Sequence, residues 1–125
     1  MILGIGIDLV EIARVEQLVQ RRGDRALRRL FTAGEVARCG RARAPGESLA
    51  ARFAAKEAFF KAIGTGWGRG VAWTEIEVCS SPNGAPRIQL SGAAERLAAD
   101  RGVINIHLSL THTDTFASAY LILEG

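Results

Sequence analysis

The sequence has few of the residues that define disulfide-rich, fibrous or membrane-spanning proteins. Of its 125 residues, 2 are cysteine, 3 are proline and 6% are aromatic, so neither a disulfide scaffold nor a proline-rich disordered chain is expected. The best candidate for a membrane span, residues 116–123, is far shorter than the required ~20 residues, and no basic segment precedes an apolar run at the N-terminus. We therefore expect one domain over residues 1–125, in the cytoplasm, with reduced cysteines and no membrane partner.

Lysine is also scarce, because 14 of the 16 basic residues are arginine. The only lysines, Lys56 and Lys61, are five residues apart, which indicates that a compact ammonium is needed there. Residues 1–62 hold 12 Lys/Arg against 7 Asp/Glu, whereas residues 63–125 hold 4 against 6. This basic half favours an acidic partner, such as a nucleic acid, a polyphosphate ligand or an acidic protein, although a solvated helix face gives the same pattern.

Apolar periodicity predicts an α+β fold, in which one long helix packs on a small antiparallel sheet. Strands are expected at residues 2–8, 74–79, 86–90, 103–111 and 115–123. Helices are expected from Asp8 to about 22, then at 25–31, 32–42, 47–63 and 91–100. Asp8 and Glu11 fit a capping box for the first helix, and Gly23 is expected to end it.

Two carboxylates and a lysine occupy positions that suit a phosphate-handling site. Asp8 shares a strand face with Gly4 and Gly6, and glycine within a strand indicates close approach of a ligand or another chain. Glu57 lies in or beside the apolar stripe of the long helix, so it needs a partner, either Lys61 or a metal ion. Carboxylates from two elements together with an ammonium suit Mg²⁺ and phosphate. The alternatives are a helix cap at Asp8 and an exposed Glu57–Lys61 pair.

Hydroxyl and imidazole side chains gather near the C-terminus, at the end of a predicted strand. Ser109, Thr111 and His112 adjoin a turn, where such groups and backbone N–H groups can hold a phosphate. For His112, as for His107 on the same strand, a structural or exposed imidazole is an equal alternative. Residues 64–66, Gly-Thr-Gly, form a helix end and only a weak phosphate loop. The sequence contains no P-loop, G-x-S-x-G motif or metal-type Cys/His spacing.

Three segments, in this order, resemble a known family. They are Gly4-Ile5-Gly6-Ile7-Asp8, then Arg52-Phe53-Ala54-Ala55-Lys56-Glu57-Ala58-Phe59-Phe60-Lys61-Ala62 followed by Gly64-Thr65-Gly66, and finally Ser109-Leu110-Thr111-His112. Together they are similar to the holo-[acyl-carrier-protein] synthase family, the short type of 4′-phosphopantetheinyl transferase, from Gly4 to the C-terminus. The second segment is the most specific. Thr111 departs from the family, which commonly has serine there, but it keeps the hydroxyl group.

The resemblance implies a reaction and a set of site residues. Coenzyme A would donate its phosphopantetheine arm to a serine of an apo acyl carrier protein, with Mg²⁺ as cofactor and adenosine 3′,5′-bisphosphate as the other product. Asp8 and Glu57 match the metal carboxylates and, with Lys61, the catalytic set. His112 matches a nucleotide-binding histidine of the neighbouring subunit in a homotrimer with shared active sites, and Arg14 matches an arginine that meets the carrier protein. The other residues expected to bind coenzyme A are Lys56, Lys61, Gly64, Ser109 and Thr111.

Two other functions remain as alternatives at this point. A non-catalytic basic module for a nucleic acid or nucleotide would need exposed aromatics or a recognisable motif, and Asp8 and Glu57 would repel phosphates without a metal. A structural oligomer without activity is disfavoured because all three motifs are intact. We therefore expect a transferase and no nucleic-acid partner. The carrier could serve fatty-acid or polyketide synthesis, and Lys61, Glu57 or a metal-bound water could take the serine proton.

Overall fold

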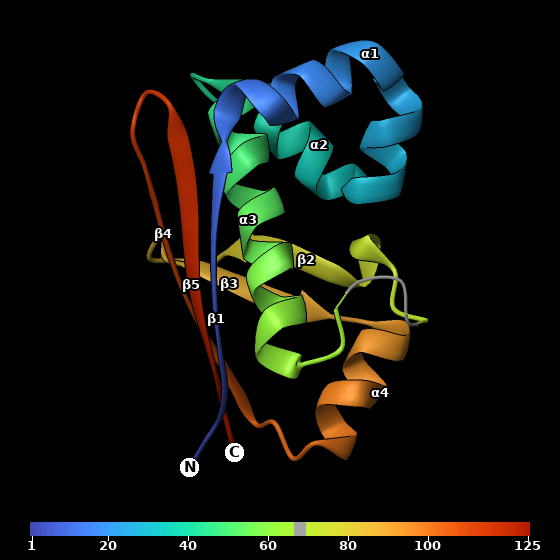
Figure 1. The fold of residues 1–125 in the computed structure, drawn as a ribbon, viewed down its shortest axis with the longest axis vertical. Coiled ribbons are helices and arrows are strands. Elements are labelled where there is room, and N and C mark those ends of the chain that lie inside the picture. The colour runs from blue at the N-terminus through green and yellow to red at the C-terminus, as the bar shows by residue number, and fades with distance from the viewer. Residues whose placement is uncertain (67–69) are drawn as a thin grey trace.

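The computed structural model describes residues 1–66 and 70–125 (Figure 1). A long central helix, α3 (Pro45–Ile63), packs against a three-stranded antiparallel sheet of order β1-β5-β4 and lies beside a two-stranded hairpin. The strands are β1 (Ile2–Glu11), β2 (Ile76–Ser80), β3 (Pro86–Leu90), β4 (Asn105–His112) and β5 (Phe116–Glu124). The other helices are α1 (Ile12–Leu30), α2 (Ala33–Gly40), the short 3₁₀ helix η1 (Trp73–Glu75) and α4 (Gly92–Asp100). The predicted α+β architecture is confirmed.

Helix α3 is buried on several sides, because its small side chains let the neighbouring elements approach closely. Its fully buried residues, each at most 1% exposed, are Ala50, Ala54, Ala55, Lys56, Ala58, Phe59 and Phe60. The helix begins with Pro45 in its first turn, where the missing N–H group costs nothing. It ends at Gly64, whose φ of 83° is the left-handed conformation that glycine adopts without strain.

The glycines of β1 allow this strand to lie directly against α3. A Cβ atom on Gly6 would overlap the Ala58 carbonyl oxygen, and one on Gly4 would overlap the Ala62 carbonyl oxygen. The close approach that the two glycines predicted is therefore made by a helix of the same chain. Since side chains alternate along a strand, Asp8 shares this face and is brought to α3 as well.

The capping box predicted at Asp8 and Glu11 is wrong. Strand β1 continues to Glu11, α1 begins at Ile12, and no side-chain hydrogen bond caps that end of the described helix. The reason is non-local, because β1 pairs with β5 along its whole length, up to Glu11 opposite Phe116. The ladder keeps Asp8 extended and leaves its carboxylate for other contacts.

The other predicted helix boundaries are closer to the structure. Gly23, with φ 59° and ψ −141°, kinks α1 rather than separating it from the predicted 25–31 helix. The helix expected from residue 32 is present as α2, and Thr32 caps it in a capping box with Glu35. Within the described ranges, no helix is both long and apolar enough to cross a membrane.

On the side of the sheet that points away from α3, β4 presents polar side chains, whereas β1 and the adjoining part of β5 are apolar and exposed. The exposed large side chains there are Leu3, Ile5, Ile7, Leu9, Phe116 and Tyr120, with between 40% and 65% of each accessible. The pairing register places Ile7 beside Tyr120 and Leu9 two residues further along the strand. Contiguous apolar patches of this kind mark interaction surfaces in proteins.

Candidate active site

A cleft of about 570 Å³ lies between β1, α1 and α3, and we name it the acidic cleft for its two carboxylates, although three arginines also line it. Asp8 enters it from β1, Arg14 from α1, and Phe53 and Glu57 from α3. The cleft is also lined by Leu9, Val10, Val15, Gln17, Leu18, Arg21 and Arg22. The structure therefore brings Glu57 of α3 together with Asp8 and Arg14, which lie near the start of the sequence.

Lys61 is paired with Asp8 at this cleft. Its Nζ donates hydrogen bonds to Asp8 Oδ1 at 3.2 Å and to the Ile7 carbonyl oxygen at 2.9 Å. The Lys61 side chain is 55% exposed, against 15% for Asp8. The two oxygens orient the ammonium group while more than half of the side chain stays accessible to a ligand.

Glu57 is the carboxyl group of the cleft whose charged form is disfavoured by its surroundings. Burial raises its pKa, the charge of Asp8 raises it further, and the nearby Lys61 and Arg14 lower it. Two carboxylates that share a cleft repel each other, and a divalent cation removes this repulsion. Mg²⁺ prefers oxygen ligands and commonly takes one or two carboxylates together with substrate phosphate and water. Asp8 and Glu57 fit this ligand set.

The cleft does not form a closed metal cage. Among residues 1–66 and 70–125, no group of three or more His, Cys, Asp or Glu side chains gathers where it could hold a metal ion. A site with two protein carboxylates leaves coordination positions for phosphate oxygens and water. This arrangement is typical of metal ions that act on phosphorylated substrates.

A second cleft, of about 610 Å³, lies between the start of α3 and the end of β4. Its polar lining residues are Arg43, Glu47, Ser48, Arg52, Thr111 and His112. His112 Nε2 lies 2.8 Å from Glu47 Oε1, and 56% of the histidine side chain is exposed. Two arginines and an imidazole give this cleft the character of an anion site.

Arg52 of this second cleft carries an unusual buried polar atom. The residue is 8% exposed, and its Nη1 donates a hydrogen bond to Ser48 Oγ at 2.7 Å. Its Nε is buried and lacks a partner among the described residues. The sequence analysis missed Arg43, Glu47 and Arg52 as site residues. The available signal was the density of arginine before α3 and the arginine that opens the central motif.

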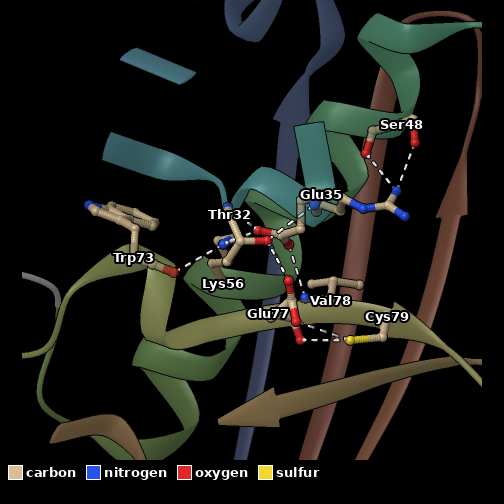
Figure 2. Close-up of polar contacts among 9 residues, drawn as sticks. Thr32, Glu35, Ser48, Lys56, Trp73, Glu77, Val78 and Cys79 are labelled. Carbon is tan, nitrogen blue, oxygen red and sulfur yellow. Dashed lines mark hydrogen bonds and ion pairs between the residues drawn. The ribbon is translucent and has the colours of Figure 1, made fainter. Parts of the chain in front are cut away.

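The remaining predicted site residues are dispersed. Thr111 lines the second cleft, and Ser109 lines a smaller one of about 290 Å³ beside the hairpin. Gly64 forms the C-cap of α3. Lys56 is fully buried and pairs with Glu35, so the expectation that it contacts coenzyme A is corrected for this geometry (Figure 2). Its ammonium group points toward Glu35 of α2, because a charge at that depth needs a paired carboxylate.

These features define a class of protein: a small α+β domain that carries a two-carboxylate cleft and a cationic cleft on one central helix. The family model for the 4′-phosphopantetheinyl transferase superfamily matches residues 4–120. The chain therefore belongs to this superfamily, which confirms the family predicted from the three sequence motifs.

Individual relatives are similar along their full length. The holo-[acyl-carrier-protein] synthase of Solibacter usitatus is 48% identical over 125 residues, which covers 100% of both chains. The synthase of Desulforudis audaxviator is also 48% identical, over 100% of this chain and 95% of its own. Among solved structures, the Neisseria meningitidis synthase superposes with a TM-score of 0.93 at 32% identity and covers 100% of both chains. The Helicobacter pylori synthase in complex with coenzyme A gives 0.85 at 32% identity, over 96% of this chain and 99% of that one.

Proposed function

We propose that this protein transfers the 4′-phosphopantetheine arm of coenzyme A to a serine of an apo acyl carrier protein and releases adenosine 3′,5′-bisphosphate. The observation that carries the proposal is the cleft lined by Asp8 and Glu57, together with the accessible lysine, Lys61, that pairs with Asp8. Full-length similarity to holo-[acyl-carrier-protein] synthases supports it, as does the coenzyme A bound to the Helicobacter pylori relative.

In this proposal, Asp8 and Glu57 hold Mg²⁺, which supplies neutralisation of the charge that develops on the pyrophosphate oxygens. Lys61 adds a fixed positive charge beside them, because Asp8 and the Ile7 carbonyl oxygen hold its ammonium group. In its neutral form the same amine would instead accept the serine proton and become the ammonium, and its exposure supports access by substrate. Orientation of both substrates in the cleft supplies much of the remaining acceleration.

The second cleft would bind the nucleotide end of coenzyme A. Arg43, Arg52 and His112 line it together and could bind a phosphate group by charge-assisted hydrogen bonds. The unpartnered Nε of Arg52 supports this role, because a buried donor without a partner is costly unless a ligand satisfies it. Thr111 borders the same cleft, while Ser109 and Gly64 remain predicted contacts of coenzyme A.

A homotrimer with shared active sites is part of the proposal. The exposed apolar surface of β1 and the adjoining part of β5 supports self-association. In the described part of the chain, the acidic and cationic clefts have no lining residue in common. In the proposed trimer, the acidic cleft of one subunit and the second, cationic cleft of the next would hold one ligand together.

Subunit complementation tests the shared site. Lys61→Ala and His112→Ala proteins should each be inactive, and mixing them with subunit exchange should restore activity, because some interfaces then contain both intact residues. Mixed-mass species in native mass spectrometry would verify the exchange. If the mixture stays inactive after verified exchange, the site lies within one chain.

The carrier protein would dock on the basic side of the acidic cleft. Arg14, Arg21 and Arg22 of α1 all line this cleft, so an acidic partner would be attracted to the point where transfer occurs. We propose that this carrier is cytoplasmic, since both cysteines of this chain, Cys39 and Cys79, are free thiols.

The direct test is to incubate the protein with coenzyme A, Mg²⁺ and a bacterial apo acyl carrier protein and to measure the carrier mass. The phosphopantetheine increment should appear, should be absent with a carrier whose acceptor serine is replaced by alanine, and should be suppressed reversibly by EDTA. An unmodified carrier under all conditions would refute the proposal. Filter binding of nucleic acid at moderate salt would then test the basic-module alternative.

A further inference from the structure

A buried ion pair joins Lys56 of α3, the residue before Glu57, to Glu35 of α2. Lys56 Nζ lies 2.7 Å from Glu35 Oε1, and both side chains are 0% exposed. Lys56 also donates a hydrogen bond to the Trp73 carbonyl oxygen at 3.0 Å, and its Nζ lies 5.4 Å from the centre of the Phe31 ring (Figure 2). Burial lowers the pKa of Lys56, and the charge of Glu35 opposes this shift. The pair has no contact with the acidic cleft, so the transfer chemistry as proposed does not use it.

Glu35 connects three elements through its two carboxylate oxygens. Oε1 accepts hydrogen bonds from Lys56 Nζ of α3 and from the Thr32 backbone N–H at the start of α2. Oε2 accepts a hydrogen bond from the Val78 backbone N–H of β2 at 2.9 Å. The Thr32 hydroxyl, in turn, donates to Glu77 Oε2 at 2.5 Å. The ion pair therefore ties α2, α3 and the hairpin to one point (Figure 2).

Trp73 links this network to the acidic cleft. While its carbonyl oxygen is held by Lys56, its ring stacks on Phe53 with 5.3 Å between centroids and meets Phe60 edge-on at 5.1 Å. Phe53 lines the acidic cleft beside Glu57, and Trp73 lines a neighbouring cleft that shares Leu18 and Arg22 with it. Displacement of the Trp73 backbone would therefore move aromatic walls of both clefts under α1.

We infer that Lys56 is a positioning residue: paired with Glu35, it fixes Trp73 against Phe53 and so shapes the surface that receives the carrier protein. This inference rests on the proposed function for its substrate. It assigns to Lys56 an effect on carrier recognition, and none on the nucleotide end of coenzyme A. Since the lysine is buried among fixed partners, it acts through the aromatic stack and not by contact with a ligand.

The first test separates the two substrates. Lys56→Gln keeps a neutral hydrogen-bond donor near Glu35 but is too short to reach the Trp73 carbonyl oxygen. The KM for apo acyl carrier protein should therefore rise about 5- to 10-fold, while the KM for coenzyme A stays unchanged. Ala98→Gly, at a buried position of α4 that lines neither cleft, provides a destabilised control that should leave both KM values unchanged. A rise in the KM for coenzyme A, or no rise in the carrier KM, overturns the inference.

The second test asks whether Lys56 acts through the tryptophan ring. Trp73→Ala should raise the carrier KM by a similar factor, and adding Lys56→Gln to it should change this KM by less than about twofold. If the two changes multiply instead, Lys56 acts by another route and the inference is wrong.

A spectroscopic test does not depend on the proposed reaction. In a Trp67→Phe background, Trp73 is the remaining tryptophan, and Lys56→Gln should shift its emission to longer wavelength as the ring loosens from Phe53. Unchanged emission overturns the inference. If the wild-type protein fails to modify any carrier, the proposed function fails, but the emission result still decides whether Lys56 positions Trp73.

Discussion

The two lysines of this chain show how one helix can place the same side chain in opposite environments. Lys56 and Lys61 both lie on α3 and both pair with a carboxylate. The Lys56–Glu35 pair is 0% exposed and satisfied by further backbone groups, whereas Lys61 is 55% exposed and shares its carboxylate partner, Asp8, with a candidate metal site. A five-residue separation turns the second lysine to a different side of the helix. The buried pair is suited to hold elements together, and the exposed pair is suited to meet a ligand.

The largest effect is expected on activity, when either of the two carboxylates of the acidic cleft is replaced. Asp8→Asn and Glu57→Gln should each lower kcat/KM for transfer by at least ~10³-fold, because each removes one of two carboxylates that would hold Mg²⁺. The carrier mass assay measures this loss, and circular dichroism should show a folded protein. Near-normal turnover of either variant in Mg²⁺ would refute the metal assignment.

Replacing the two lysines should lower stability by very different amounts. Lys56→Met should lower the free energy of unfolding by about 3–5 kcal/mol, because it leaves the Glu35 carboxylate buried without its cation. Lys61→Met should change it by less than ~1 kcal/mol, because the Asp8 pair is partly solvated. Urea unfolding of the two variants gives the comparison directly. Equal losses would contradict it.

The contact between β1 and α3 is what delivers Asp8 to the exposed pair. Gly6→Ala should therefore destabilise the fold by about 1–3 kcal/mol or more, since the added methyl group would overlap the Ala58 carbonyl oxygen. Gly40→Ala is the matched control, because a Cβ there meets no atom within 4 Å, and it should be neutral or slightly stabilising. Thermal unfolding separates the two outcomes, and an unperturbed Gly6→Ala protein would show that the strand can shift away.

The chemical role of Lys61 can be tested by a change that keeps its charge. Lys61→Arg should lower kcat by at least ~10-fold, because a guanidinium does not accept a proton and does not match the compact ammonium held by Asp8 and Ile7. Single-turnover kinetics measure the step. Full activity of Lys61→Arg with an inactive Lys61→Ala would assign the lysine to charge stabilisation alone.

The smallest expected effect is a change in thermal stability when the charge of Glu57 is removed. The raised pKa of Glu57 means that its charged form is less favourable in the folded protein than in the unfolded chain, so stability is lost as the pH rises from the unfolded to the folded pKa. Glu57→Gln should therefore raise Tm at neutral pH by roughly 1–3 °C without Mg²⁺ and should weaken the dependence of Tm on pH over the acidic range. Mg²⁺ should stabilise the wild type and not this variant. A lower Tm for the variant would contradict the assignment.

Features with local causes could be predicted from the sequence, and features with distant causes could not. The Thr32–Glu35 capping box, the Gly64 helix end and the hairpin around residues 82–84 follow from neighbouring residues, and the structure contains them. The length of β1 depends on its pairing with β5 at the other end of the chain. The strand was therefore predicted to end too early, and the helix cap predicted at Asp8 was wrong. The terminal strands were nevertheless recognised from their alternation.

The residues of the candidate site also differ in whether local sequence could predict them. Asp8, Glu57 and Lys61 were identified because each breaks a local pattern. The structure places Asp8 and Glu57 in one cleft and pairs Lys61 with Asp8. The burial of Lys56 depends on Glu35, which lies 21 residues away on another helix, and so local spacing gave no sign of it. The Glu47–His112 contact joins the start of α3 to the end of β4 and has no sequence signature either.

The pairing of the first strand with the last has a consequence for how the protein is made. Asp8 and Ser118, whose hydroxyl group donates a hydrogen bond to the Asp8 carbonyl oxygen, are 110 residues apart. At the ribosomal rate of about 5–20 residues per second, β1 leaves the ribosome roughly 5–20 s before β5 exists to pair with it. During this interval an apolar, glycine-containing strand has no sheet partner within its own chain. Nascent chains of this protein should therefore depend on chaperones more strongly before residue 118 has emerged than after it.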